Sequence, residues 1–171
     1  MDLAAHIRQI RDFPKRGILF YDISTLIQDA GAWQVAIDRM AELVAPFRPD
    51  RLVAIESRGF LFGAPLALRL GVGMAMVRKR GKLPGSVVGH AYTLEYGNDT
   101  IEVSADLIDP GSRVVVVDDL IATGGTAAAT VELMRKVETE VAGIVFLIEL
   151  TGLVGRGKLD VPARSVLSFE G

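Results

Sequence analysis

Apolar residues recur along this chain with two different spacings, one typical of helices and the other of strands. Between residues 32 and 47 they follow one another at intervals of three and four, as Trp33, Ile37, Met40, Val44 and Phe47. This spacing places them on one face of an amphipathic helix, which Pro46 and Pro49 end. Further helices are predicted at residues 2–12, 60–70 and 126–137.

Continuous apolar runs rich in β-branched residues predict buried strands. They occur at residues 52–55, 72–77, 114–117 and 144–150, with a last strand at 164–169. Residues 92–96 and 100–103 are typical of a hairpin whose turn is Gly97-Asn98-Asp99, and residues 13–29 are predicted to be irregular. Strands that alternate with helices predict a single α/β domain, residues 1–171, in which helices flank both faces of an open, mostly parallel sheet.

Composition narrows the class of the protein without identifying its chemistry. Of the 171 residues, 50% are hydrophobic and 23% are charged, as in an ordinary globular domain. A formal net charge of −2 provides no positive field that would gather DNA or RNA, so no nucleic-acid partner is expected. The chain has no cysteine, which excludes disulfides, thiolate metal sites and cysteine nucleophiles. Since neither a signal-peptide pattern nor an apolar run of about 18 residues occurs, a cytoplasmic protein without membrane contact is predicted.

The clearest chemical signal lies in residues 114–129. Four valines lead into Asp118 and Asp119, and residues 123–126, Thr-Gly-Gly-Thr, then open a helix. A helix that begins at the carboxyl edge of a sheet binds phosphate through free backbone N–H groups, and glycines let the backbone close around it. Carboxylates bind a vicinal diol or a magnesium ion. The segment therefore predicts a site for a ribose 5-phosphate.

Residues 114–126 resemble the phosphoribosyl pyrophosphate signature of type I phosphoribosyltransferases. Further segments narrow this resemblance to the adenine phosphoribosyltransferases, in whose order and spacing they occur: residues 13–14, 17–20, 57–63, 78–84 and 94–97. The likeness covers nearly the whole chain. The Arg-Gly-Phe-Leu-Phe-Gly segment and the Leu-Glu-Tyr-Gly segment are the ones that indicate adenine.

This resemblance implies a fold and a reaction. The type I fold adds a flexible lid hairpin, residues 78–103, and a small N-terminal base-binding hood, residues 1–30, to the open sheet. The implied enzyme is a pentosyltransferase of purine salvage that converts adenine and 5-phosphoribosyl 1-pyrophosphate to AMP and pyrophosphate. It uses Mg²⁺ that is bound through phosphoribosyl pyrophosphate, near Asp118 and Asp119, rather than by protein ligands alone. The resemblance also implies a homodimer.

Individual roles follow from the same resemblance. The ribose hydroxyls are bound by Asp118 and Asp119, and the 5-phosphate by Ala122, Thr123, Gly124, Gly125 and Thr126. Pyrophosphate is bound by Ser57, Arg58, Arg78, Lys79 and Lys82. Adenine is bound by Leu19, Phe20 and Tyr21, chiefly through main-chain groups. The catalytic residues are Arg58, which neutralises the leaving pyrophosphate, and Glu95, which stays ionised and accepts the proton of the purine.

The resemblance also suggests that the Glu56–Ser57 peptide is a candidate for a cis bond. Arg16 and Tyr21 stand where the family usually has proline and arginine, but adenine binding is expected to survive because the base is read mainly by the main chain. The basic run at residues 78–82 is typical of an exposed loop. A lid is favoured because a reaction through an oxocarbenium ion must exclude water.

Two other functions remain open. The first is a phosphoribosyltransferase for xanthine or hypoxanthine, although such enzymes commonly place a lysine in the base pocket and none is identified here. The second is a non-catalytic regulator that senses phosphoribosyl pyrophosphate and contacts nucleic acid. The net charge of −2 and the retention of Glu95 and Lys82 argue against a regulator.

Overall fold

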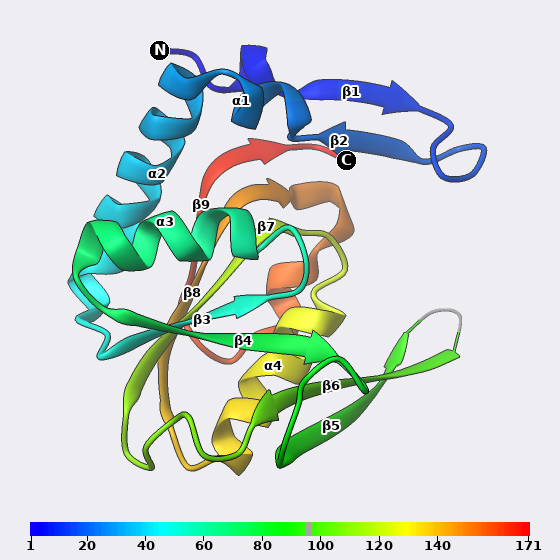
Figure 1. Ribbon diagram of the computed structural model, residues 1–171. Coiled ribbons are helices and arrows are strands. Elements are labelled where there is room, and N and C mark those ends of the chain that lie inside the picture. Colours follow the sequence, from blue (N-terminus) through cyan, green and yellow to red (C-terminus); the bar gives the residue numbers. More distant parts are fainter. Residues whose placement is uncertain (95–96) are drawn as a thin grey trace.

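A large sheet forms the centre of the molecule in the computed structural model, which describes residues 1–94 and 97–171. Its strands are β3 (Arg51–Ile55), β4 (Gly73–Lys79), β5 (Val87–Leu94), β6 (Gly97–Ser104), β7 (Arg113–Ile121), β8 (Glu140–Leu150) and β9 (Ala163–Phe169). Across the sheet they lie in the order β5-β6-β4-β3-β7-β8-β9 (Figure 1). The strands from β4 to β9 in this order run parallel, whereas β5 and β6 form an antiparallel hairpin at one edge. The predicted mostly parallel sheet is confirmed.

Helices cover both faces of this sheet, as predicted. They are α1 (Ser24–Gln28), α2 (Ala30–Val44), α3 (Phe60–Leu70) and α4 (Gly125–Lys136), with short 3₁₀ helices η1 (Ala4–His6), η2 (Ala45–Phe47), η3 (Thr151–Leu153) and η4 (Gly155–Lys158). Side chains of β7 alternate between the faces, since Val115 and Val117 pack in the core beneath α2 and α3, and Val114 and Val116 pack beneath α4. This alternation buries β7 on both faces and fixes the position of its carboxyl end.

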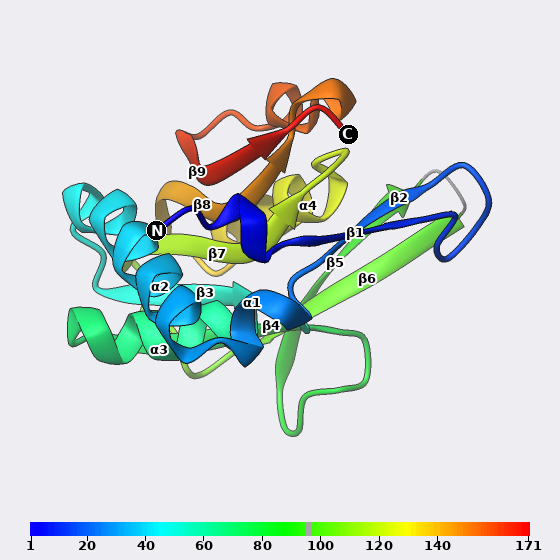
Figure 2. The same cartoon turned by 90° about the horizontal axis from the view of Figure 1, so that it is seen from above.

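An N-terminal hairpin lies outside the large sheet. Strand β1 (Arg8–Arg11) pairs antiparallel with β2 (Leu19–Asp22), and the hairpin projects on the side where β3 and β4 end, opposite the β5–β6 hairpin (Figures 1 and 2). Asp22 anchors it, because its carboxylate accepts a hydrogen bond from the backbone N–H of Ser24 at 2.9 Å and pairs with Arg8. We call residues 1–30 the hood. It faces the edge of the sheet at which ligands of α/β proteins bind.

Several predicted elements are wrong at the N-terminus. Residues 2–12 form the short helix η1 and strand β1 rather than one helix, and residues 13–29, predicted to be irregular, contain β2 and α1. Strand pairing prevails here because Arg8 to Arg11 align with Asp22 to Leu19, a partner that the local sequence pattern does not reveal. By contrast, the helices predicted near residues 32–47, 60–70 and 126–137 are confirmed with small shifts.

Two strand boundaries also differ from the prediction. Gly97, Asn98 and Asp99, predicted as a turn, lie within β6, so the hairpin strands pair over Val87–Leu94 and Gly97–Ser104. Strand β7 continues to Ile121, so Asp118 and Asp119 are part of the strand. Backbone pairing with β8 reaches Ile121 and extends the strand beyond its apolar run. Among the described residues, no helix is both long enough and apolar enough to cross a lipid bilayer.

Replacing Asp22 by asparagine tests whether its carboxylate holds the hood. Hydrogen bonds from Ser24, with Arg8 adding to them, lower the pKa of Asp22 from 3.8 to about 2. The ionised group therefore stabilises the fold above about pH 3.8, and this contribution is lost as the pH falls through about 2. We expect Asp22→Asn to lower the free energy of unfolding by about 1–2 kcal/mol at neutral pH.

Urea unfolding across the acid range measures this effect. The difference between the wild type and Asp22→Asn should shrink as the pH approaches 2, the value to which the pKa is lowered. The exposed Asp106→Asn serves as a control that leaves stability unchanged. A difference that is the same at every pH would show that the charge of Asp22 does not stabilise the hood.

Candidate active site

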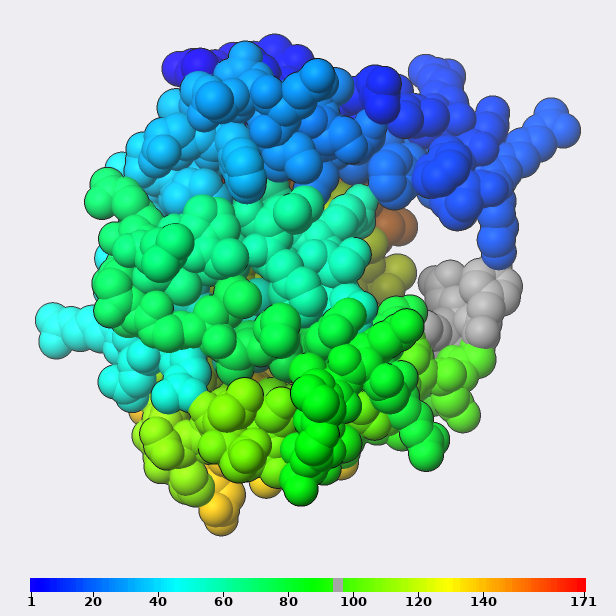
Figure 3. All heavy atoms as spheres, viewed as in Figure 1, coloured from blue at the N-terminus to red at the C-terminus, as the bar shows by residue number. Residues whose placement is uncertain are grey.

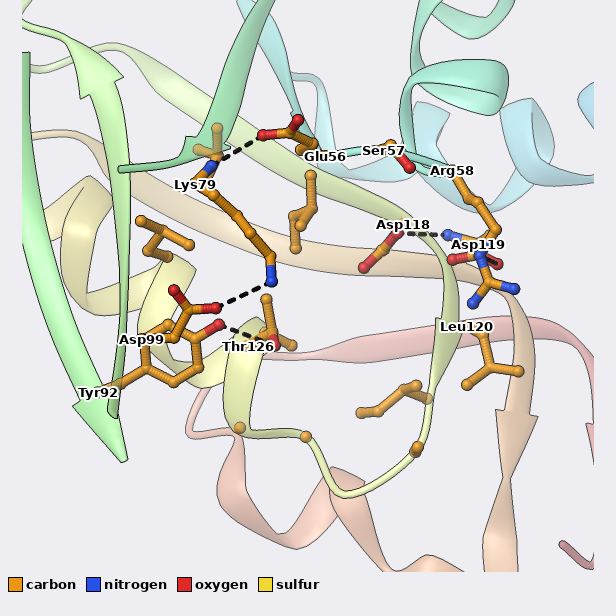
Figure 4. A pocket seen from close by; sticks show the side chains of 18 of the residues that line it. Glu56, Ser57, Arg58, Lys79, Tyr92, Asp99, Asp118, Asp119, Leu120 and Thr126 are labelled. Atoms are coloured by element: carbon orange, nitrogen blue, oxygen red, sulfur yellow. Dashed lines mark hydrogen bonds and ion pairs between the residues drawn. The ribbon is translucent and has the colours of Figure 1, made fainter. Parts of the chain in front are cut away.

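A cavity of about 270 Å³ opens at the carboxyl edge of the large sheet, where β3, β4 and β7 end. It is lined by the β3–α3 loop, the end of β4, the β5–β6 hairpin and the loop that joins β7 to α4 (Figure 4). The predicted residues that it brings together are Ser57, Arg58, Arg78, Lys79, Asp118, Asp119, Ala122, Thr123, Gly124, Gly125 and Thr126. The space-filling view shows the surface hollowed between the hood and the end of β4 (Figure 3).

The loop from Ala122 to Gly125 is held in shape by direct backbone contact. Gly124 has φ +77°, and a Cβ atom on it would lie 2.2 Å from the carbonyl oxygen of Gly155. A Cβ on Gly155 would in turn lie 2.1 Å from the carbonyl oxygen of Ala122. Helix α4 begins at Gly125, and its first turn borders the cavity. The first N–H groups of a helix have no intrahelical acceptor and carry partial positive charge, so this loop is suited to bind an anion.

Asp118 and Asp119 lie side by side at the floor of the cavity. Asp119 is 4% exposed, and its Oδ2 lies 3.0 Å from Nε of Arg58. Burial raises the pKa of Asp118 well above its usual value, and repulsion by Asp119 adds to this shift. Burial also raises the pKa of Asp119, while Arg58 opposes the rise. The unliganded protein therefore holds a pair of carboxylates whose joint ionisation is unfavourable.

The turn after β3 is shaped to fit this acid pair. A Cβ on Gly59 would lie 2.4 Å from the carbonyl oxygen of Ile55 and 2.8 Å from Oδ1 of Asp118, so only glycine fits. The Glu56–Ser57 peptide in the same turn is cis, as the resemblance suggested. The turn thus directs Arg58 toward Asp119 without blocking Asp118.

Cations line the opposite wall. Glu56 accepts hydrogen bonds from the Arg78 guanidinium at 2.9 Å and from the backbone N–H of Lys79 at 2.8 Å, and the bond to Arg78 lowers the pKa of Glu56. The Lys79 ammonium pairs with Asp99 at 3.1 Å, which raises the pKa of Lys79. Lys79 therefore stays charged beside the anion-binding loop. Lys82 is exposed and is not part of the cavity wall; its carbonyl oxygen accepts a hydrogen bond from Arg78.

A second cavity, of about 360 Å³, lies beneath the hood and shares Arg58 with the first. Phe20 lines it, and its ring centroid is 5.3 Å from Cζ of Arg58. Tyr21 is 4% exposed and its ring stacks on Phe169 with 4.7 Å between centroids, so its side chain belongs to the core. Leu19 is half-buried against the core. Of the three residues predicted for the base, only Phe20 presents its side chain to this cavity.

Glu95, the predicted proton acceptor, lies outside the described residues. Sequence patterns did not predict Tyr92, Asp99 or Gly155, which line or support the cavity. The first two reach it through hairpin register, and Gly155 through contact with a loop about 30 residues earlier, so no local signal marks them. Within the described part of the chain, no three His, Cys, Asp or Glu side chains gather in a way that could hold a metal ion.

Comparisons with known proteins agree with this geometry. A family model described as "Phosphoribosyl transferase domain" matches residues 22–170. Adenine phosphoribosyltransferase of Gluconacetobacter diazotrophicus is 61% identical over 170 residues, which cover 99% of this chain and 97% of that protein. The protein of the same name from Rhodospirillum centenum is 58% identical, with 99% of both chains covered.

Solved structures are similar over almost the whole chain. Adenine phosphoribosyltransferase from Thermoanaerobacter pseudethanolicus superimposes with a TM-score of 0.95 at 47% identity, and 98% of each chain is covered. The enzyme from Saccharomyces cerevisiae, complexed with adenine and an imino-altritol 1,6-bisphosphate, gives a TM-score of 0.89 at 43% identity and covers 95% of this chain and 94% of that one.

Asp118→Asn should stabilise the unliganded fold in metal-free buffer. The variant removes a carboxylate whose pKa is raised in the folded state, while its Oδ1 can still accept the backbone N–H of Asp119. Because the unfolded chain loses this proton near pH 3.8, the wild type loses stability as the pH rises above that value and the variant does not. We expect a gain of about 1 kcal/mol near neutral pH that disappears below about pH 3.8, measured by urea unfolding. A loss of stability at neutral pH would contradict the assignment.

Gly155→Ala should damage the anion-binding loop from behind. The new Cβ would meet the carbonyl oxygen of Ala122 at 2.1 Å, so the loop must shift. Binding of ribose 5-phosphate should weaken by about tenfold or more, as measured by calorimetry. Gly157→Ala is the matched control, because its Cβ would meet only a methyl group of Val154 at 3.8 Å. Equal affinities of both variants would mean that Gly155 does not shape the loop.

Proposed function

The chain belongs to the phosphoribosyltransferase domain family and, within it, to the adenine phosphoribosyltransferases, and we propose that the cavity at the carboxyl edge of the sheet is its active site. Members of this group convert adenine and 5-phosphoribosyl 1-pyrophosphate to AMP and pyrophosphate, which is the function of this chain. The observation that carries the site assignment is the meeting, in one cavity, of an anion-binding loop and an acid pair of which Asp119 is buried.

Ribose 5-phosphate would lie along the β7–α4 segment. Asp118 and Asp119 bind the two ribose hydroxyls, which donate hydrogen bonds to carboxylate oxygens. The 5-phosphate accepts hydrogen bonds from the backbone of residues 122–126 and from the hydroxyls of Thr123 and Thr126. Binding a diol would stabilise the ionised carboxylates, whose joint charge burial makes unfavourable.

The pyrophosphate would face the cationic wall. Ser57, Arg58, Arg78 and Lys79 border this part of the cavity, and Lys82 stays a prediction from the resemblance. As the bond from ribose C1 to pyrophosphate breaks, negative charge grows on the leaving oxygen and positive charge on the ribose. Fixed cations stabilise the leaving group most in the transition state, where its charge is greatest. Arg58 can act on both the pyrophosphate and the ribose, because its guanidinium also pairs with Asp119.

The acid pair also fits a magnesium ion that arrives with the substrate. Oδ2 of Asp119 is buried without a hydrogen-bond partner among the described residues, although Arg58 lies nearby. Oxygen donors of this kind suit Mg²⁺, and two carboxylates alone would leave most of its ligands to the substrate. When bound, Mg²⁺ neutralises pyrophosphate charge. A dependence on magnesium is part of this proposal.

Adenine would enter the cavity beneath the hood. Phe20 and Arg58 both line that space, where Cζ of Arg58 lies over the Phe20 ring at 5.3 Å from its centroid, and stacking on this lining would hold a planar base. The main chain of β2, residues 19–21, would read the base edge. Stacking of Tyr21 on Phe169 keeps β2 in place, so a tyrosine here is compatible with main-chain recognition. When N9 forms its bond to C1, Glu95 accepts the proton that N9 loses.

An apolar stripe supports the proposed homodimer. Leu61, Ala64 and Leu68 are exposed at helical spacing along α3, and Leu68 is 87% exposed. Met76 on the neighbouring strand β4 is also exposed. A second copy of the chain would cover this surface. A cytoplasmic location and the absence of a nucleic-acid partner stay predictions from the sequence, and the alternative substrates and the regulator are not favoured by the comparisons.

A panel of free bases tests the substrate assignment. With phosphoribosyl pyrophosphate and magnesium, adenine should release pyrophosphate, whereas hypoxanthine, guanine and xanthine should not.

In the same assay, Glu95→Gln should lower kcat by about tenfold or more while the affinity for phosphoribosyl pyrophosphate changes little. Equal losses in both quantities would indicate a structural role for Glu95, and faster turnover of hypoxanthine would refute the choice of adenine.

Leu68→Glu tests the proposed dimer surface. A carboxylate at this most exposed position of the apolar stripe would be desolvated on association, so the variant should sediment as a monomer at concentrations where the wild type is a dimer. Leu107→Glu, at a residue 59% exposed between β6 and β7, should leave the mass unchanged. Sedimentation velocity checks both, and a dimeric Leu68→Glu would remove α3 from the interface.

A further inference from the structure

One side chain of the β5–β6 hairpin reaches the anion-binding loop. Tyr92 lies in β5, and its hydroxyl oxygen is 3.3 Å from Oγ1 of Thr126, in the first turn of α4 (Figure 4). Both residues line the cavity at the carboxyl edge of the sheet. The ring of Tyr92 is half-buried against the core on the α4 side of the sheet. Its apolar part is therefore packed while its hydroxyl faces polar groups of the cavity.

Pairing across the hairpin fixes the place of Tyr92. Its partner in β6 is Asp99, whose carboxylate holds the ammonium of Lys79 at 3.1 Å. Lys79 ends β4 and pairs with Ile101 of β6. Tyr92 is thus tied to the main sheet through β6 and through the Asp99–Lys79 ion pair, which crosses the cavity in Figure 4. Direct packing of β5 on α4, with a hydrogen bond from Lys136 to the carbonyl oxygen of Gly89, also keeps its hydroxyl near Thr126.

The contact between the two hydroxyls is longer than a strong hydrogen bond. Hydroxyl pairs usually lie about 2.5–3.0 Å apart, so at 3.3 Å this one is weak and easily exchanged. A phosphoryl oxygen is a better acceptor than a threonine hydroxyl, because hydrogen bonds to a charged acceptor are shorter and about twice as strong. A phosphate held by the backbone at residues 122–126 would offer such an oxygen beside Thr126.

We propose that Tyr92 is a further positioning residue for the 5-phosphate, to which its hydroxyl donates a hydrogen bond from the hairpin side. The proposal rests on the assignment of the loop at residues 122–126 to that phosphate. The loop binds the phosphate from the α4 side and Tyr92 binds it from the hairpin side.

This arrangement has a consequence for the reaction. Loss of the Tyr92 hydroxyl should raise KM for phosphoribosyl pyrophosphate more than KM for adenine, since Tyr92 does not line the cavity beneath the hood that is proposed for adenine.

Tyr92→Phe tests the proposal because it removes only the hydroxyl and keeps the packed ring. Calorimetry with ribose 5-phosphate and, separately, with inorganic pyrophosphate measures the two ends of the site. We expect affinity for ribose 5-phosphate to fall by about tenfold and affinity for pyrophosphate to stay unchanged. The melting temperature should stay within a degree or so of the wild type, since the lost contact is weak. Thr93→Ala, whose hydroxyl instead bonds Asn98, is the matched control and should bind both probes normally.

A second variant distinguishes the role of Tyr92 from the assignment of residues 122–126 to the 5-phosphate. Thr126→Val removes the hydroxyl of the loop itself and should also weaken ribose 5-phosphate. If Thr126→Val weakens ribose 5-phosphate and Tyr92→Phe does not, the role of Tyr92 is refuted and the loop assignment stands. If neither variant lowers the affinity for ribose 5-phosphate, the role of Tyr92 and the loop assignment are both refuted. Parallel losses of pyrophosphate affinity in Tyr92→Phe would also overturn the proposal, because they would indicate a general distortion of the hairpin.

Discussion

Repulsion between two buried carboxylates is the constraint around which the rest of this site is arranged. Asp118 and Asp119 are neighbours in a strand that is buried on both faces, so neither can move far from the other. Burial raises the pKa of both groups, while Arg58 and the backbone N–H groups of Asp119 and Leu120 oppose the rise. A ligand that brings hydroxyl donors or a cation to this point relieves the strain of joint ionisation. The pair therefore costs the fold some stability, and a ligand that binds both carboxylates would recover it.

The other charges of the site are separated so that each end of the ligand meets its complement. In the proposed complex the acids would face the diol, backbone N–H groups at the start of α4 would face one phosphate, and Arg78 and Lys79 would face the other. The protein as a whole carries a net charge of −2, so this positive wall is a local feature. Glu56 and Asp99 keep the two cations in position. The cations can still attract pyrophosphate, because it carries more negative charge than either carboxylate.

Local patterns in the sequence were enough for the parts of the site that lie on one continuous segment. The valine run, the two acids and the Gly-Gly-Thr start of α4 are adjacent in the chain, so strand, ligand groups and helix start could be predicted together. The elements predicted at residues 2–12 and 13–29 are wrong because β1 and β2 are short and depend on contacts such as Asp22 with Arg8 and Tyr21 with Phe169. Gly155 and Tyr92 were missed for the same reason. One touches a loop distant in the sequence, and the other reaches the site through hairpin register.

A crystal structure of the protein with ribose 5-phosphate bound would test the central claim most directly. The account predicts the phosphoryl group against the backbone amides of residues 122–126, with both ribose hydroxyls donating to Asp118 and Asp119. A sugar phosphate bound elsewhere, with this loop vacant and the acid pair in contact with solvent alone, would contradict it.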